Sequence, residues 1–183
     1  VALGYRQYDV HLSRASVRQS LGDAEGHLRE LTAAVRSAPE IFKAKSAELD
    51  DKTAAEWILS VLKSVEKADG LLKRARRECG RERYDKALPL LAECARIDPG
   101  NSKAYLLMAE GKAALKRPDE AIKDIDKAVR LDPCAESYAK RADLAQRFGY
   151  MEAALKDLSL ALALSPEVKL YQWRARAFLG MRH

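Results

Sequence analysis

Side chains that could carry out chemistry are few and scattered along this chain of 183 residues. The histidines are His11, His27 and His183, the cysteines are Cys79, Cys94 and Cys134, and a group of aspartates is Asp124, Asp126 and Asp132. Cysteines spaced by 15 and 40 residues fit no zinc or redox motif. No glycine-rich phosphate loop or nucleophile motif is present, and no base accompanies the aspartates. We therefore expect no enzymatic activity, no metal and no cofactor.

The charge of the chain is mildly basic, with 33 Lys and Arg against 27 Asp and Glu and a net charge of +6. This balance could favour acidic peptides as partners and is weak evidence for nucleic acid. Nucleic-acid binding would need a continuous basic face with stacking aromatics. Acids interrupt most of the helices expected below, and aromatic residues make up 7% of the chain. No run of about 18 apolar residues occurs, so the sequence predicts no membrane span.

A periodic pattern of small residues organises the chain over 68–166. One alanine recurs every 33 or 34 residues, at Ala75, Ala109, Ala142 and Ala175. A second alanine follows the same period at Ala87, Ala121 and Ala154, and a proline closes each unit at Pro99, Pro133 and Pro166. A period near 34 residues indicates stacked helix pairs, because one amphipathic pair cannot bury its apolar face alone. We expect the two helices of each pair to cross at the alanines.

The expected helix pairs follow from this period and from the turn residues between them. They cover 71–77 with 84–97, 102–115 with 118–131, and 135–148 with 150–165, and a single helix covers 168–180. Asn101 is expected to cap one helix, and Gly149 to form a turn. Larger residues should fill the space between pairs: Tyr105, Tyr138 and Tyr171 at one position, and Leu91, Ile125 and Leu158 at another. Cys94 falls at a position that calls for a small buried residue, so we interpret it as a core thiol.

The residues before the regular units form a divergent copy and an insert. Two helices joined by a turn at Gly22 and Asp23 are expected over 8–39, with His27 in place of the alanine. The insert holds a helix over 40–49 and another that begins at a Thr53-x-x-Glu56 capping box and runs through Leu72. Trp57 lies in its apolar stripe. The predicted organisation is thus a divergent repeat over 1–39, an insert over 40–67, three regular repeats over 68–167 and the first helix of a further repeat over 168–183.

The motifs within the regular units resemble one family of helical repeats. They are Tyr105-x-x-Met108-Ala109, Asp119-Glu120-Ala121-Ile122 and Leu131-Asp132-Pro133, and then Tyr138-x-x-Arg141-Ala142 with Gly149-x-x-x-x-Ala154-Leu155. The pattern resembles the tetratricopeptide repeat family. The resemblance implies an all-α, right-handed superhelical solenoid of antiparallel helix pairs, with a concave face lined by the first helices. It also implies a role in binding peptides or proteins without catalysis.

A second likeness concerns the order of a repeat, an insert and further repeats. The residues are Lys63-Ser64-x-Glu66, Arg74-x-x-x-x-Cys79 and Arg117-Pro118-x-x-Ala121-Ile122-x-Asp124. They are similar to the repeat arm of DnaJ-type co-chaperones, although no His-Pro-Asp signature of a J domain occurs. This likeness implies binding of hydrophobic client segments through Leu106, Leu107 and Trp173. It admits the lumen of the endoplasmic reticulum as a location besides the cytoplasm.

The concave face implied by the resemblance would display the first-helix residues that the core does not use. Our candidate binding residues are Lys73, Arg76, Lys103, Leu106, Leu107, Glu110, Lys140, Asp143, Arg147, Lys169, Trp173 and Arg176. This set is mostly basic with a few apolar members, so we interpret it as a groove for a protein or peptide segment of acidic and hydrophobic character. The alternative is a solvated helix face whose charges pair with one another.

Some members of the family grip the C-terminal carboxylate of chaperones with a clamp of lysines and asparagines. The asparagine and first lysine positions of that clamp hold Leu72, Arg76 and Leu107 in one placement, and Leu106, Glu110 and Lys140 in another. In the second placement only Lys169 fits its position, and Trp173 replaces the expected arginine. We therefore predict that the clamp is absent.

The leading functional hypothesis is a protein-interaction scaffold, in a co-chaperone or assembly factor. The alternative is a structural subunit docked permanently in a large complex. Nucleic-acid binding is the least favoured class.

Overall fold

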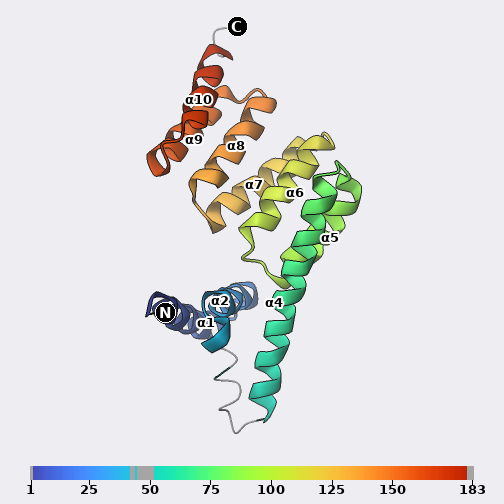
Figure 1. Cartoon of the computed structure of the whole chain (residues 1–183), viewed down its shortest axis with the longest axis vertical. Helices are drawn as coiled ribbons and strands as arrows, with labels where there is room; N and C mark the ends of the chain where they lie inside the picture. The colour runs from blue at the N-terminus through green and yellow to red at the C-terminus, as the bar shows by residue number, and fades with distance from the viewer. Residues whose placement is uncertain (1, 42–43, 45–51, 181–183) are drawn as a thin grey trace. The chain divides into compact units, whose positions relative to one another are not determined.

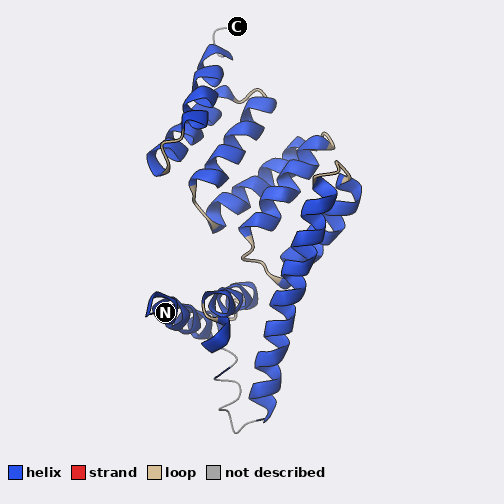
Figure 2. Cartoon of the chain, viewed as in Figure 1, coloured by secondary structure: helices blue, strands red, loops and turns tan. Residues whose placement is uncertain are grey.

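The structure is a computed structural model that describes residues 2–41, 44 and 52–180. All the regular elements in this described part of the chain are helices (Figures 1 and 2). The predicted all-α class is confirmed. By their contacts the residues form two compact units. The N-terminal unit comprises the chain up to residue 74 together with 92–100, and the C-terminal unit comprises 75–91 and the chain from 101 onward.

The N-terminal unit begins with a helical hairpin of α1 (Ala2–Ser20) and α2 (Ala24–Ser37). Gly22 has a φ of +74°, a left-handed conformation that glycine adopts without steric cost. The Asp23 carboxylate then accepts a hydrogen bond of 2.8 Å from the Gly26 amide and caps α2. The predicted hairpin and its turn are both confirmed. His27 stands at the position where the regular units have alanine. Its Nδ1 donates a hydrogen bond of 2.8 Å to the Ala15 carbonyl, because a carbonyl oxygen can only accept.

The long helix α4 (Lys52–Cys79) begins one residue before Thr53 of the predicted capping box and runs through Leu72 without a break. Val61, Leu62 and Val65 of α4 are buried in one cluster with Ala34 and Val35 of α2. Their spacing of three and four residues places them on one side of the helix. The side chains of Thr53, Glu56 and Trp57 and most of the predicted helix over 40–49 lie outside the described residues.

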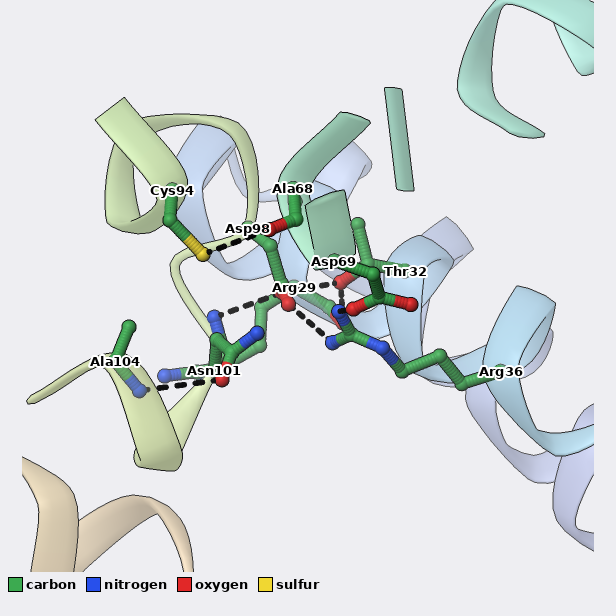
Figure 3. Close-up of polar contacts among 10 residues, drawn as sticks. Arg29, Thr32, Arg36, Ala68, Asp69, Cys94, Asp98, Asn101 and Ala104 are labelled. Atoms are coloured by element: carbon green, nitrogen blue, oxygen red, sulfur yellow. Dashed lines mark hydrogen bonds and ion pairs between the residues drawn. The ribbon is translucent and has the colours of Figure 1, made fainter. Parts of the chain in front are cut away.

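A buried carboxylate ties α2 to the turn that follows α5 (Tyr84–Ile97) (Figure 3). Asp98 is fully buried, and it accepts hydrogen bonds from the Thr32 hydroxyl at 2.9 Å and from the Gly100 amide at 3.3 Å. Arg36 forms an ion pair with the other Asp98 oxygen and a second one with Asp69 at 2.7 Å. The cost of burying the carboxylate is thus offset by several donors.

Cys94 lies beside this cluster on α5 (Figure 3). Its thiol is fully buried and donates to the Ala68 carbonyl over 3.3 Å. Burial, with a further contribution from the Asp98 carboxylate, raises the pKa of Cys94 to about 11. The interpretation of Cys94 as a core thiol is confirmed.

The C-terminal unit contains the end of α4, the first part of α5 and five further helices. These are α6 (Ser102–Ala114), α7 (Pro118–Leu131), α8 (Ala135–Arg147), α9 (Met151–Leu164) and α10 (Val168–Gly180). The predicted bounds agree with these within one or two residues. Asn101 caps α6 by accepting from the Ala104 amide at 3.3 Å, and Gly149 turns the chain after α8 with a φ of +82°. Successive helices pack against one another from α6 to α10 (Figure 1).

Small residues form the crossing points of this unit, as predicted. All six alanines predicted at the crossings of the three pairs are fully buried: Ala75, Ala87, Ala109, Ala121, Ala142 and Ala154. Leu91, Ile125 and Leu158 fill the space beside them and are also buried. Tyr105 is buried and Tyr138 is half-buried, but Tyr171 is 49% exposed. The expectation that Tyr171 fills the core is wrong, because α10 contacts α9 through its opposite side, at Leu170 and Ala177.

Candidate functional site

The candidate binding residues of the C-terminal unit lie on the first helices of its pairs. Arg76 lies in α4, and the other candidates lie in α6, α8 and α10, whereas Lys73 belongs to the N-terminal unit. We define the first-helix face by the accessible candidates of this unit: Arg76, Lys103, Leu107, Glu110, Lys140, Asp143, Arg147, Lys169, Trp173 and Arg176. Leu106 is 8% exposed and packs inside, so its prediction as a contact residue is wrong.

A cleft of about 310 Å³ opens on this face between α8 and α10. Its apolar walls are Ala135 and Ala139 of α8 and Leu170 and Trp173 of α10. The cleft exists because α8 places two alanines opposite the Trp173 indole, and two small side chains cannot fill the space. Trp173 also packs partly against the core shared by α8 and α9, which holds its ring in place. Apolar walls of this kind suit an aliphatic or aromatic side chain.

Charged residues surround the apolar walls. Lys140, Lys169, Glu136 and Glu167 line the cleft together with the residues above. The Lys169 ammonium lies 4.8 Å from the centre of the Trp173 ring, within the range of a cation–π interaction. The cleft therefore combines an aromatic wall with two ammonium groups, and the structure brings together the predicted residues Lys140, Lys169 and Trp173.

Part of the charge on the first-helix face is paired locally. Lys140 lies 3.4 Å from Glu110 on α6, and Arg147 lies 2.8 Å from Asp143 one turn away. By contrast, Lys103 and Arg176 have no carboxylate partner among the described residues. Exposed pairs of this kind are weak, typically worth about 0–1 kcal/mol, so an incoming carboxylate could compete for Lys140. Some charges of this face thus pair locally, and the charges without such a pair among the described residues are positive.

Glu110 is held against the second helix of the preceding pair. Gly111 next to it lets α6 approach α5, since a methyl group there would lie 3.3 Å from the Tyr84 ring and 3.4 Å from Leu88. Burial raises the pKa of Tyr84 and of the Cys79 thiol, and the Glu110 carboxylate adds to both shifts. Glu110 is therefore a fixed negative charge at one end of the face, and it positions Lys140 beside the cleft.

Sequence reasoning missed five residues that line the cleft. These are Ala135, Glu136, Ala139, Glu167 and Leu170. The repeat period could have found Glu136, because it lies 33 residues from both Lys103 and Lys169. The sequence alone gives no sign that the two alanines border an open space.

The two histidines in the described part of the chain both contact oxygens of the N-terminal unit. His11 contacts Glu30 at 2.7 Å, His27 contacts a backbone carbonyl, and His183 lies outside the described residues. No cluster of three His, Cys, Asp or Glu side chains that could hold a metal occurs among the residues searched, which are the described ones. Within the same residues, every helix is too short or too polar to cross a membrane.

Comparison with known proteins identifies which residues form the repeats. The tetratricopeptide repeat family matches residues 80–144 and again residues 135–168. Hsc70-interacting protein 1 of Drosophila melanogaster is 28% identical to this chain over 110 residues, which are 60% of the chain and 29% of that relative. The chain thus spans less than a third of the length of the curated relatives it matches.

Solved structures share the fold. The first tetratricopeptide domain of Spaghetti (RPAP3), bound to the HSP90 peptide SRMEEVD, has a TM-score of 0.61 and 22% identity, over 64% of this chain and 98% of that one. The MamA protein has a TM-score of 0.58 and 15% identity, over 96% of this chain and 82% of that one. The sequence matches, the crossing alanines and the helix pairs together show that residues 80–168 of this chain are tetratricopeptide repeats.

Proposed function

We propose that the first-helix face binds a segment of another protein that carries both acidic and apolar residues, and that the chain works as an interaction scaffold in a co-chaperone or assembly factor. The observation that carries the proposal is the cleft between α8 and α10, which the Trp173 indole lines together with Lys140 and Lys169. An apolar side chain can enter this cleft while a neighbouring carboxylate meets an ammonium group. The chain itself is proposed to have no enzymatic activity.

The comparisons support a chaperone as the source of such a segment. One similar structure is bound to the HSP90 peptide SRMEEVD, and one relative is named for interaction with Hsc70. The peptide SRMEEVD has three acidic residues beside a methionine and a valine. This is the same combination of charge and apolar character that the cleft would accept.

The ligand is proposed to bind without a terminal carboxylate clamp. Of the positions that would form the clamp, Leu106 is buried, Glu110 is itself acidic, and Trp173 stands where an arginine would be needed. A free C-terminal carboxylate would gain little there. Recognition would instead depend on side chains within the segment, so internal segments are as suitable as chain ends.

A peptide titration tests both parts of the proposal. Fluorescein-labelled SRMEEVD would be made in two forms, one with a free C-terminal carboxylate and one with a C-terminal amide. Each peptide would be titrated with the 183-residue chain. We expect the two dissociation constants to agree within about threefold, because a neutral end removes no clamp contact. Trp173→Leu should weaken both peptides by about tenfold or more, as expected for a central aromatic contact. Lys86→Ala, which removes an exposed cation from α5, is the matched control.

The outcomes separate the two parts. Loss of binding on amidation would contradict binding without a clamp while leaving peptide binding intact. Equal affinity of wild type and Trp173→Leu, with unchanged helix content by circular dichroism, would contradict the cleft as the site. If neither peptide bound at about 1 mM, the proposed function would fail for this class of segment.

The likeness to DnaJ-type arms stays a prediction. It would use the same surface for unfolded client chains, through Leu107 and Trp173, which are both half-buried and accessible. A permanently denatured, carboxymethylated protein that competes with SRMEEVD in the titration above would support client binding.

A further inference from the structure

The cleft between α8 and α10 has two carboxylates among its polar side chains. Glu136 lies in the first turn of α8, and Glu167 comes directly before α10, where its backbone carbonyl accepts a hydrogen bond of 3.0 Å from the Leu170 amide. Both side chains are exposed and line the cleft. Because each stands at the N-terminal end of its helix, we call Glu136 and Glu167 the acidic end of the cleft.

Neither carboxylate at the acidic end is neutralised within the described part of the chain. The Glu136 side chain has no hydrogen bond or ion pair there, and the Glu167 carboxylate accepts only a hydrogen bond of 3.2 Å from the Ser165 hydroxyl. The two lysines that line the cleft instead contact the carboxylate and the indole described above. Two negative charges in a cleft with apolar walls are therefore available to a ligand.

The carboxylates and the ammonium groups follow one another along the two helices. Lys140 lies four residues after Glu136, which at a rise of 1.5 Å per residue is about 6 Å along α8. On α10 the Lys169 side chain reaches forward to the Trp173 ring, so its ammonium also lies beyond Glu167. An extended segment advances about 3.3 Å per residue, so a cation and an acid within one or two residues of a central apolar side chain cover this distance.

We infer that the cleft selects a segment in which a lysine or arginine lies beside the apolar residue, on the side opposite its acid. Glu136 and Glu167 recognise the cation, and a segment with acids on both sides of its apolar residue is repelled at the acidic end. The repeat period supports a local role: Glu136 lies 33 residues from both Lys103 and Lys169, so an acid interrupts a row of lysines. The inference rests on the proposed function, because it gives a sequence preference to the ligand of the same site.

A comparison of three labelled peptides tests the inference. The probe SRMEEVD has an arginine before its methionine and acids after it, SQMEEVD lacks the arginine, and SMREEVD moves it to the acidic side. We expect the 183-residue chain to bind SRMEEVD about fivefold more tightly than either of the others at about 50 mM NaCl. In the double variant Glu136→Gln with Glu167→Gln this preference should fall below about twofold, while SQMEEVD binds at least as tightly as it does to the wild type. Asp119→Asn with Glu152→Gln, which removes two exposed first-turn acids from second helices, is the matched control and should keep the preference.

The outcomes distinguish this inference from the proposed function. If SRMEEVD binds and Trp173→Leu weakens it, but the three peptides bind the wild type equally, the inference fails and the proposed function stands. A preference for SRMEEVD that survives in Glu136→Gln with Glu167→Gln would place the arginine elsewhere and also overturn the inference. Equal binding of SRMEEVD and SMREEVD would contradict the assigned order of the charges. Absence of SRMEEVD binding to the wild type would contradict the proposed function and the inference with it. Binding of SQMEEVD by the double variant shows that this variant is folded.

Discussion

At the scale of single residues, Asp98 is the most connected side chain of the N-terminal unit. It joins Thr32 and Arg36 on α2, which precede it by 66 and 62 residues. The sequence places Asp98 in a turn before Pro99, but gives no sign of partners that far away. Turn chemistry is local and can be predicted, whereas a buried ion pair depends on which helices meet.

Replacement of Asp98 should destabilise this unit. Asp98→Ala removes the acceptor of the buried Thr32 hydroxyl and one of the two carboxylates of Arg36. We expect the free energy of unfolding to fall by about 2–3 kcal/mol, toward the lower end for a broken buried pair because Arg36 keeps Asp69. Urea denaturation followed by circular dichroism measures this. Glu93→Ala, which breaks exposed pairs with Arg96 and Lys67, should change the midpoint much less. Equal effects of the two changes would contradict the role of Asp98.

The three cysteines should differ in reactivity. The thiolate is the reactive form, and burial raises the pKa of Cys94 from 9.0 to about 11. The folded protein therefore holds this proton more tightly than the unfolded chain, and Cys94 favours folding below pH 9 but not above pH 11. At pH 8 we expect iodoacetamide to label half-buried Cys134 well before Cys94, as followed by peptide mass spectrometry. Labelling of Cys94 at the rate of Cys134 would show that the thiol is accessible.

At the scale of elements, the helices of the C-terminal unit could be predicted almost to the residue. Alanine at a fixed period, proline at unit ends and capping residues such as Asn101 are local signals. They can therefore be recognised without knowledge of the tertiary structure. The errors concern burial. Leu106 is covered and Tyr171 is open because the side chain's neighbours, and not its own helix, decide its exposure.

A larger side chain at a crossing alanine should separate two helices. Ala109 on α6 is fully buried, so Ala109→Leu overpacks the contact with α7 and should lower the unfolding free energy by about 1–3 kcal/mol. Ala114→Leu, at an exposed position near the end of the same helix, is the control and should be close to neutral. Thermal unfolding of both variants compares them. A crossing that tolerates leucine would mean that the helices do not approach closely there.

Two glycines should respond to alanine with opposite signs. Gly70 lies inside α4 with nothing within 4 Å of the added methyl group, so Gly70→Ala should stabilise by roughly 0.5–1 kcal/mol. Gly149 has a φ of +82°, where an alanine is strained, and Gly149→Ala should destabilise by about 1 kcal/mol. Differential scanning calorimetry gives the two shifts. A shift of the same sign in both would contradict the helical conformation at Gly70 or the left-handed turn at Gly149.

At the scale of the whole molecule, the charges that make up the net charge of +6 are not spread evenly over the surface. Most acids of the first-helix face are paired with neighbours, while Lys103, Lys169 and Arg176 have no ion-pair partner in the described chain. The sequence could identify which residues line this face. It could not give the cleft, because a cleft depends on the difference in size between side chains on α8 and α10.

The surplus of cations should appear in the salt dependence of binding. Lys140→Ala with Arg176→Ala should weaken SRMEEVD by about threefold to tenfold at low salt and flatten the dependence of affinity on salt, since screened charges contribute less. Lys86→Ala with Lys123→Ala removes the same charge from second helices and is the control. Fluorescence anisotropy between about 50 and 300 mM NaCl gives the slopes. Parallel slopes for the two double variants would show that the net charge, and not the face, attracts the peptide.

Two helices of the chain belong to both compact units. The residues of α4 up to 74 belong to the N-terminal unit and its last five residues to the C-terminal unit. Helix α5 is divided between the two units after Leu91. A protein truncated at the first regular repeat, near Ala68, would cut α4 in its middle and expose four backbone amides that now bond to the preceding turn. Such a fragment would begin with a frayed end and lack the partners of Cys94 and Asp98. Shortened versions made for crystallisation or binding work should therefore retain α2 as well as the whole of α4.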